Sequence, residues 1–230
     1  MDTLRKNSTN AIRILTAVLI AKVTIGVVLR YGEYLPPDFQ SDFLVGRSGY
    51  FFGSYSVSFY VHIVTGPITL LAGLALMSQW FLRRFPQWHS RLGKLQVVCV
   101  LATSASGLWM AQHAATGAIA GIGFATLAVV TAASVLLGWR TAVQRRFVEH
   151  RRWMMRCFIL LCSAVVLRLT AGLATVTAFD ADWVYPLSAW ACWLVPLFAY
   201  EIARSKFLRS VCVRLAHGVP NRRIKRSQAS

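Results

Sequence analysis

The chain has 230 residues, of which 56% are hydrophobic and only 14% are charged, and its mean hydropathy is +0.52. This composition is typical of a protein that crosses a membrane several times, and it argues against an ordinary soluble enzyme. The net charge of +17 does not indicate a nucleic-acid-binding face, because the basic residues form short clusters between apolar stretches rather than one continuous surface.

Six apolar stretches are long enough to cross about 30 Å of hydrocarbon as helices that rise about 1.5 Å per residue. They lie near residues 11–30, 56–82, 93–115, 118–139, 153–178 and 185–203. No small-residue cleavage site follows the first stretch, so we expect it to remain as a helix rather than to be removed as a signal peptide. The sequence therefore predicts an all-α integral membrane protein, with a six-transmembrane helix bundle at residues 11–203, a short terminus at 1–10 and a basic tail at 204–230.

The distribution of Lys and Arg predicts the orientation of this bundle. The N-terminus carries three of these residues, the connection between the second and third spans four, the connection between the fourth and fifth spans six, and the tail eight. The opposite side carries only Arg30 and Arg47, together with five acidic residues. Because basic connections stay in the cytoplasm, we expect both the N- and C-termini to be cytoplasmic.

The connection at residues 31–55 is the only long one on the predicted external side. Its sequence, YGEYLPPDFQSDFLVGRSGYFFGSY, is rich in Pro, Gly and aromatic residues, which suits a cap at the membrane interface better than a separate domain. The remaining connections are short, so successive helices should be antiparallel neighbours. The basic tail has weak amphipathic spacing, and we expect it to set the topology and to rest on anionic lipid at the cytoplasmic face.

The five cysteines lie within or near the spans and form no CxxC pair, so the sequence indicates neither a disulfide framework nor a zinc site. The sequence also lacks the motifs of serine hydrolases, zinc metalloproteases and nucleotide-binding loops. The chemistry of any site is therefore expected to come from histidines and from charges inside the membrane.

Four histidines fall at two levels of the predicted bundle. His62 and His113 lie near the external ends of the second and third spans, and His89 and His150 lie at the cytoplasmic starts of the third and fifth. Transmembrane b-type cytochromes hold one haem near each face, and each iron takes two axial imidazoles. One hypothesis is therefore a haem b at each pair. The fourth span has no histidine, so neighbouring helices would have to supply both ligands.

A simpler interpretation competes with haem binding at each pair. Gly66 and Gly73 follow His62 at helical spacings and leave a groove that suits either a flat macrocycle or a closely packed helix. His89 and His150 lie in very basic stretches, PQWHSRLGK and VEHRRWMMR. There, binding of lipid headgroups or the start of a helix explains them equally well.

Arg168 lies inside the fifth span, eighteen residues after His150 and therefore on the same face of a straight helix. A charge there costs at least ~2.5 to 3.5 kcal/mol, and no acidic residue lies in the outer half of any span. Its partner would be a backbone carbonyl, Asp180 or Asp182, or an anion brought by a ligand, such as a haem propionate or a lipid phosphate. We therefore expect Arg168 to form the cationic wall of a polar pocket that opens externally beneath residues 31–55.

Glu201 lies near the cytoplasmic end of the sixth span, at the level of Arg152 and Arg156 in the fifth. Opposite charges at matching depth in neighbouring helices favour an ion pair. We expect Glu201 to pair with one of these two arginines and to join the last two helices.

Four stretches of the chain resemble one family. These are HIVTGPITLLAG, RRFPQWHSRLGK, EHRRWMMRCFILLCSAVVLRL and YPLSAWACWLVPLFAYE. They are similar to a bacterial family of predicted membrane proteins, domain of unknown function 2306, over roughly residues 55–203. The resemblance implies a protein of the bacterial cytoplasmic membrane, and the family's label names no activity. The positions that the family's pattern emphasises are His62, Gly66, Pro67, His89, Gly93, His150, Arg151, Trp153, Arg156, Arg168 and Glu201.

One departure from the family's pattern is visible. Ile68 and Thr69 stand where the family often has a glutamine after the Gly66-Pro67 pair. We therefore do not expect a polar site directly below Pro67.

Three classes of function are open. The first is a membrane redox or haem-associated protein with a polar pocket near the external face. The second is a non-catalytic assembly or accessory protein whose polar residues only fix helix packing. The third is a transporter of small molecules or lipids with Arg168 as the anion anchor, which the lack of a visible inverted repeat disfavours.

Overall fold

The computed structural model describes residues 2–41, 43–114, 117–177 and 181–217, and every helix or strand that it assigns in these ranges is a helix. Six helical segments are long and apolar enough to cross a membrane. They are Ile14–Glu33, Ser54–Met77, Pro86–Ala111, Ala118–Val143, Phe147–Val176 and Val184–Lys206. The prediction of an all-α, six-span integral membrane protein is confirmed.

The helices follow one another along the chain with few long connections. α1 (Asp2–Leu29) runs into the 3-10 helix η1 (Arg30–Glu33), and a segment with the short helix α2 (Ser48–Phe51) leads to α3 (Ser54–Met77). Next come α4 (Gln79–Arg84), α5 (Pro86–Ala111) and α6 (Ala118–Val143). The described chain ends with α7 (Phe147–Leu161), α8 (Ser163–Val176) and α9 (Val184–His217).

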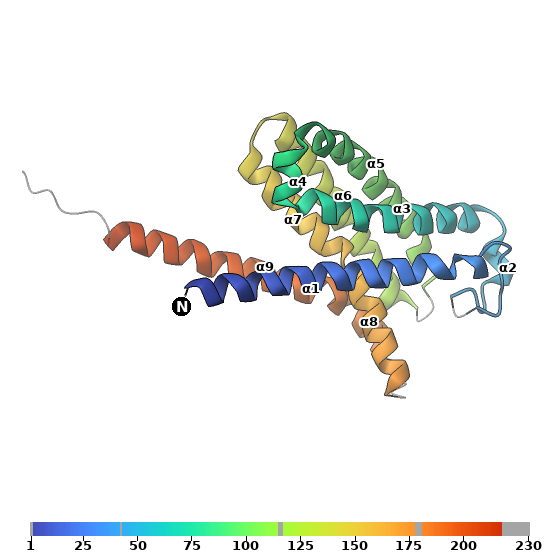
Figure 1. Ribbon diagram of the computed structural model, residues 1–230. Coiled ribbons are helices and arrows are strands. Elements are labelled where there is room, and N and C mark those ends of the chain that lie inside the picture. The colour runs from blue at the N-terminus through green and yellow to red at the C-terminus, as the bar shows by residue number, and fades with distance from the viewer. Residues whose placement is uncertain (1, 42, 115–116, 178–180, 218–230) are drawn as a thin grey trace, which may run out of the picture.

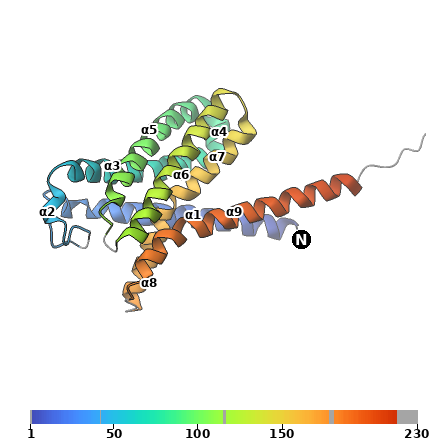
Figure 2. The ribbon, with the colours of Figure 1, turned by 180° about the vertical axis from the view of Figure 1, so that it is seen from behind.

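The centre of the bundle is formed by α3, α5, α6 and α7, each packed against the next (Figure 1). α9 packs against α6, α7 and α8, while α1 lies at the edge against α3 and α8 (Figure 2). The main core draws on most of these helices and consists of Ile20, Leu70, Val100, Val135, Met154, Cys157, Leu161 and Val165.

The second span ends earlier and the third starts earlier than predicted, because local capping, rather than hydropathy, stops or starts the helix there. The second span stops at Met77, since Ser78 turns extended (ψ 119°) and its hydroxyl accepts a hydrogen bond from the Phe81 N–H at 3.3 Å. The third span starts at Pro86 and not at residue 93, since proline is well suited to the first turn of a helix, where its missing N–H has no cost.

The fifth predicted span is divided at Cys162 into α7 and α8. The N–H groups of Val165 and Val166 both bond to the Cys162 carbonyl, at 3.0 and 3.1 Å, so the chain is tightened there for one turn. This turn lies between His150 and Arg168, so the straight-helix argument for a shared face does not hold. Beyond it, α8 runs away from the four central helices (Figure 1).

The two ends of the bundle differ in character (Figure 1). At one of them, called the capped end below, lie η1, α2 and the cap, residues 34–53. A second core joins the cap to α3, and its residues Leu44, Phe51, Tyr55 and Phe59 are at most 2% exposed. At the opposite end lie α4 and the α6–α7 turn, which carry clustered arginines. This separation is the one that the predicted orientation requires.

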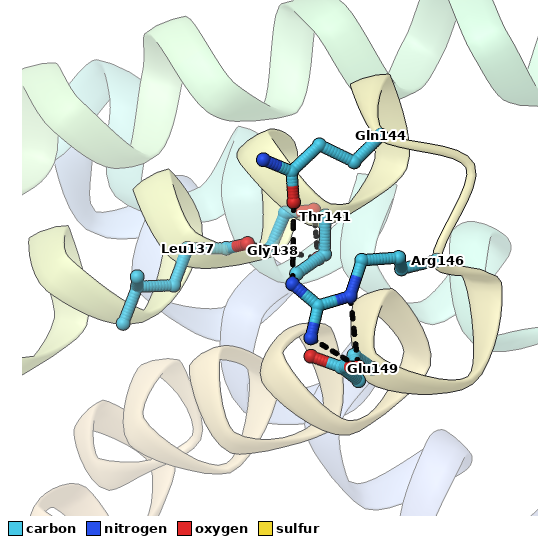
Figure 3. A network of polar contacts seen from close by, with 6 residues as sticks. All are labelled: Leu137, Gly138, Thr141, Gln144, Arg146 and Glu149. Atoms are coloured by element: carbon cyan, nitrogen blue, oxygen red, sulfur yellow. Dashed lines mark hydrogen bonds and ion pairs between the residues drawn. The ribbon is translucent and has the colours of Figure 1, made fainter.

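The α6–α7 turn is stabilised by polar contacts among Leu137, Gly138, Thr141, Gln144, Arg146 and Glu149 (Figure 3). The Thr141 hydroxyl donates back to the Leu137 carbonyl at 2.8 Å, and Arg146 binds Glu149 through Nε at 2.9 Å. Because this ion pair is exposed, it adds at most ~1 kcal/mol. These contacts stabilise the last turn of α6 and the first turn of α7, on either side of the connection.

Glu201 joins α9 to α7. Its Oε1 accepts a hydrogen bond from Arg156 Nε at 2.7 Å, and Arg204 Nη1 approaches its other oxygen at 3.6 Å. Arg152, the other partner predicted for Glu201, forms no ion pair within the described ranges. The Arg156 guanidinium also lies over the Trp153 ring, 4.6 Å from its centroid. The pair is only partly sealed from solvent, since 37% of the Glu201 side chain is exposed.

Glu201→Gln is expected to lower the free energy of unfolding by about 1 kcal/mol, because the ion pair is partly exposed. Unfolding in detergent should show coupling between Glu201→Gln and Arg156→Gln in a double-mutant cycle. The matched cycle with Arg152→Gln should show none. Coupling to Arg152 alone would contradict the observed pairing.

Both termini are predicted to be cytoplasmic, and cysteine labelling in intact cells checks this orientation. In a background whose native cysteines are replaced by serine, an impermeant maleimide should label Gln40→Cys in the cap. Gln144→Cys in the α6–α7 turn should react only after the cells are broken, although both positions are exposed in the fold. The reverse pattern would place the capped end in the cytoplasm.

Candidate functional site

A cavity of about 280 Å³ lies at the capped end, between the cap and residues of α1, α3, α5, α6, α7, α8 and α9. Most of its wall is apolar. The arginines, histidines and tyrosines that line it are Arg47, Arg168, His62, His113, Tyr31, Tyr34, Tyr55 and Tyr185. No Asp or Glu is among the described residues of its wall. The cavity is therefore a positively charged chamber with hydroxyl groups and few other polar contacts.

Arg168 reaches this cavity from α8. Within the described ranges its one hydrogen bond is a long one, 3.4 Å from Nη1 to the Ala164 carbonyl, and it forms no ion pair there. Asp182 does not pair with it, and Asp180 lies outside the described residues. The Tyr31 phenol is one of its electrostatic neighbours. Most of the five N–H donors of the guanidinium are therefore left for a ligand.

Arg47 lines the same cavity from the cap, but the fold holds it in place. Its Nη1 donates to the Tyr55 hydroxyl at 2.8 Å and to the His113 carbonyl at 3.1 Å. Its Nε donates to the Phe43 carbonyl at 2.7 Å, and the guanidinium lies 4.7 Å from the centroid of the Phe43 ring. Arg47 thus ties the cap to α3 and to the α5–α6 connection, and it adds a second positive charge to the wall.

His62 lines the cavity from α3, and α5 fixes its ring. Nδ1 lies 3.1 Å from the Thr103 carbonyl, which can only accept, so this nitrogen carries the proton. Gly107 leaves room for the ring, since a Cβ at that position would lie 3.2 Å from His62 Cε1. Nε2 forms no hydrogen bond with the described residues and is free to accept one. Arg168 is an electrostatic neighbour of the ring.

His113 also lines the cavity but lies about two helical turns from His62. Its ring stacks on Tyr50 with centroids 4.7 Å apart and meets Tyr55 edge-on at 5.1 Å. Tyr55 and His62 are seven residues apart on α3, which is about 10 Å of helix rise. Two imidazoles on one iron lie within roughly 4 Å of each other, since each metal–nitrogen bond is about 2 Å. These contacts place the two rings beside different residues, and the predicted pairing of His62 and His113 around one haem stays a prediction.

His89 and His150 lie at the opposite end, in the first turns of α5 and α7, where they interact electrostatically. His150 Nδ1 lies 2.8 Å from the Gly138 carbonyl, whereas His89 Nδ1 is buried without a hydrogen-bond partner in the described part of the chain. No group of three or more His, Cys, Asp or Glu that could hold a metal ion occurs among the described residues. The structure thus brings these two histidines together, away from the cavity.

Pro67 acts on the site through the backbone. It lies inside α3 and has no N–H, so the carbonyl of Ile63, one turn earlier, has no helical donor. The Tyr31 hydroxyl, from η1, donates to that carbonyl instead. This bond fixes Tyr31 in the cavity wall, where it neighbours Arg168.

A second cavity of about 100 Å³ shares several wall residues with the first, among them Tyr31, His62, Thr103 and Arg168. Gly66 borders it, and a Cβ at Gly66 would meet nothing within 4 Å. Gly73 is different, because a Cβ there would lie 2.6 Å from Phe158 Cδ2. The predicted groove along Gly66 and Gly73 is therefore open at Gly66 and filled by helix packing at Gly73.

Arg47 and Gln96 are two polar residues of this region that the sequence did not single out. The sequence could have indicated Arg47, because it is one of only two basic residues in the predicted external connections. Gln96 is 2% exposed and donates from Nε2 to the Thr69 carbonyl at 3.0 Å. It supplies, from α5, the polar group below Pro67 that the sequence of α3 itself does not provide.

The family model described as predicted membrane protein (DUF2306) matches residues 59–203. This range includes His62, Pro67 and Arg168, whereas Tyr31 and Arg47 lie outside it. The chain matches no curated protein and no solved structure.

Tyr31→Phe is expected to lower the free energy of unfolding by roughly 1–3 kcal/mol, the cost of leaving a partly buried carbonyl unpaired. Pro67→Ala restores the N–H of the helix, so Tyr31→Phe should cost much less in that background. Tyr60→Phe removes a tyrosine bond to the Tyr34 carbonyl (2.9 Å) and serves as the control, with the same cost in both backgrounds. Unfolding in detergent measures all four costs, and an unchanged cost of Tyr31→Phe would disprove the compensation.

Proposed function

The chain belongs to the predicted membrane protein family DUF2306, and we propose that it binds an anionic group in the cavity at its capped end. The anion is a carboxylate or a phosphate. Arg168 contacts it directly, and Arg47 adds positive charge. Because the capped end is predicted to be external, the ligand comes from outside the cell or from the outer leaflet. The observation that carries this proposal is that Arg168 lines a cavity whose described wall has no carboxylate.

The position of Arg168 within a membrane-spanning helix supports a role beyond packing. A guanidinium stays protonated in proteins, and placing a charge within a membrane helix costs at least ~2.5 to 3.5 kcal/mol. Its single long bond to the Ala164 carbonyl satisfies little of its donor capacity. A bound carboxylate or phosphate would offset the charge and accept two parallel hydrogen bonds from the planar fork.

Other groups in the wall suit the remaining atoms of such a ligand. The Tyr55 hydroxyl accepts a hydrogen bond from Arg47, which leaves its own proton for an anionic oxygen. His62 Nε2 accepts, so it suits a hydroxyl on the ligand rather than the anion itself. Because Arg47 is already bonded to the cap and to α3, its charge is held in place before the ligand arrives.

A haem held by His62 is a second candidate. The favouring observation is that a ring whose Nδ1–H is bonded to a carbonyl shares both cavities with Arg168, which could bind a propionate. Reduced and oxidised absorption spectra of protein purified with haem supplied test this candidate. It requires a Soret band that is lost in His62→Ala and retained in His113→Ala. Protein without such a band has no haem at this site.

The anion proposal is tested by the shift in unfolding temperature that glycerol 3-phosphate causes in protein purified in a neutral detergent. The wild type should be stabilised. Arg168→Met should fold at least as well as the wild type but bind about 10- to 100-fold more weakly, since hydrogen bonds to charged groups contribute about 1.5–3 kcal/mol. Arg168→Lys keeps the charge without the fork, so its affinity should be intermediate.

Arg140→Met is the control for this experiment, because it removes an exposed arginine of α6 at the opposite end. It should bind glycerol 3-phosphate as the wild type does. Equal stabilisation of the wild type and Arg168→Met would refute the anion site. Loss of folding in Arg168→Met, together with unchanged behaviour of Arg168→Lys, would instead make Arg168 a structural clamp on the Ala164 carbonyl.

A further inference from the structure

We infer that the anion is the head of an amphiphile, and that a hydrocarbon chain of the same molecule lies in the second cavity. This inference rests on the proposed function, because it specifies the molecule whose anionic group Arg168 binds. The ligand class is a membrane lipid with a phosphate or carboxylate head. The chain enters the space between α1, α3 and the α7–α8 junction.

The polar groups lie where the two cavities meet. Tyr31, His62 and Arg168 belong to the walls of both. From this level the wall of the second cavity runs from Tyr31 of η1 back to Val23 of α1, eight residues or about 12 Å of helix rise. A head bound at Arg168 therefore has an elongated space directly beside it, deeper in the bundle.

The second cavity is suited to hydrocarbon. Its wall includes Val23, Val27, Leu70, Leu161 and Val165. Two threonine hydroxyls also line this cavity, and both are already bonded. Thr24 donates to the Ile20 carbonyl and Thr69 to the Gly66 carbonyl, both at 2.7 Å. Water in such a space finds few partners, whereas a hydrocarbon chain gains from burial. A small soluble anion makes no use of it.

α1 provides the route from the bilayer. It packs against α3 and α8, and within the described ranges it has no contact with α5, α6 or α9. Figures 1 and 2 show it along the edge of the bundle. Its side chains Leu19, Ile25 and Val28 are 38–53% exposed, as expected of a lipid-facing surface. Lys22 of α1 is exposed and directly precedes Val23 of the cavity wall, so a lipid chain that enters beside α1 passes one charged residue of this helix.

The experiment extends the glycerol 3-phosphate assay to lysophosphatidic acids of increasing acyl chain length. Gly66→Leu narrows the second cavity, because Gly66 borders it and an added Cβ meets open space. Gly93→Leu is the matched control, since this α5 glycine has equally open surroundings and borders neither cavity. Val23→Phe narrows the same cavity from α1 and keeps the test valid if Gly66→Leu does not fold.

In the wild type and Gly93→Leu, the apparent affinity should rise about tenfold or more from glycerol 3-phosphate to the longer lysolipids, since each buried methylene adds several-fold. Gly66→Leu and Val23→Phe should bind glycerol 3-phosphate like the wild type but lose most of this rise. If the apparent affinity rose with chain length as much in these variants or in Arg168→Met as in the wild type, the rise would reflect partition of the lysolipid into detergent. That result would overturn the inference.

The two proposals fail in different ways. Binding of glycerol 3-phosphate that depends on Arg168, without any effect of chain length, would remove the amphiphile and leave the anion site intact. Binding of neither glycerol 3-phosphate nor any lysolipid through Arg168 would remove both.

Discussion

A guanidinium that cannot lose its proton, carried into the membrane on α8, is the constraint around which the capped end is organised. The protein does not neutralise Arg168 with a carboxylate from the described part of the chain. It surrounds the charge with phenols, an imidazole and open space. Arg47, in contrast, is bonded to Phe43, Tyr55 and His113. Arg47 therefore holds the cap in place, and Arg168 is left available for a ligand.

The backbone carbonyls near this site have hydrogen-bond donors, whereas most donors of the Arg168 side chain have no acceptor in the described part of the chain. In hydrocarbon a free carbonyl has no water to bind, so each one needs a donor from the protein. The carbonyl that Pro67 deprives of its donor is satisfied by Tyr31, and buried threonines bond back to carbonyls of their own helices. At the capped end, unused hydrogen-bonding capacity of the described residues lies on Arg168, on Nε2 of His62 and on the buried Nδ1 of His113.

Hydropathy predicts the spans well because the thickness of the bilayer sets the length of an apolar helix. Helix ends depend on caps, so the helices end and begin at Ser78 and Pro86 rather than where hydropathy changes. Nothing in the composition around Cys162 indicates that a helix divides there. The cost of a charge inside a membrane-spanning helix was enough to expect a cavity beside Arg168. Counting depth along separate helices could not distinguish the levels of His62 and His113, because their contacts depend on how α3 and the cap pack together.

The hydrogen bonds at the capped end also bear on whether the region that the family model matches can stand alone. Residues 59–203 begin after η1 and the cap, yet three side-chain hydrogen bonds of the described residues cross this boundary. They run from Tyr31 to the Ile63 carbonyl, from Arg47 to the His113 carbonyl and from Tyr60 to the Tyr34 carbonyl. A chimaera that joined residues 59–203 to a foreign N-terminal helix would deprive the Ile63 and His113 carbonyls of these donors and open the cavity on one side. The unit that can be transplanted intact therefore has to start before Tyr31, with the helix that carries it.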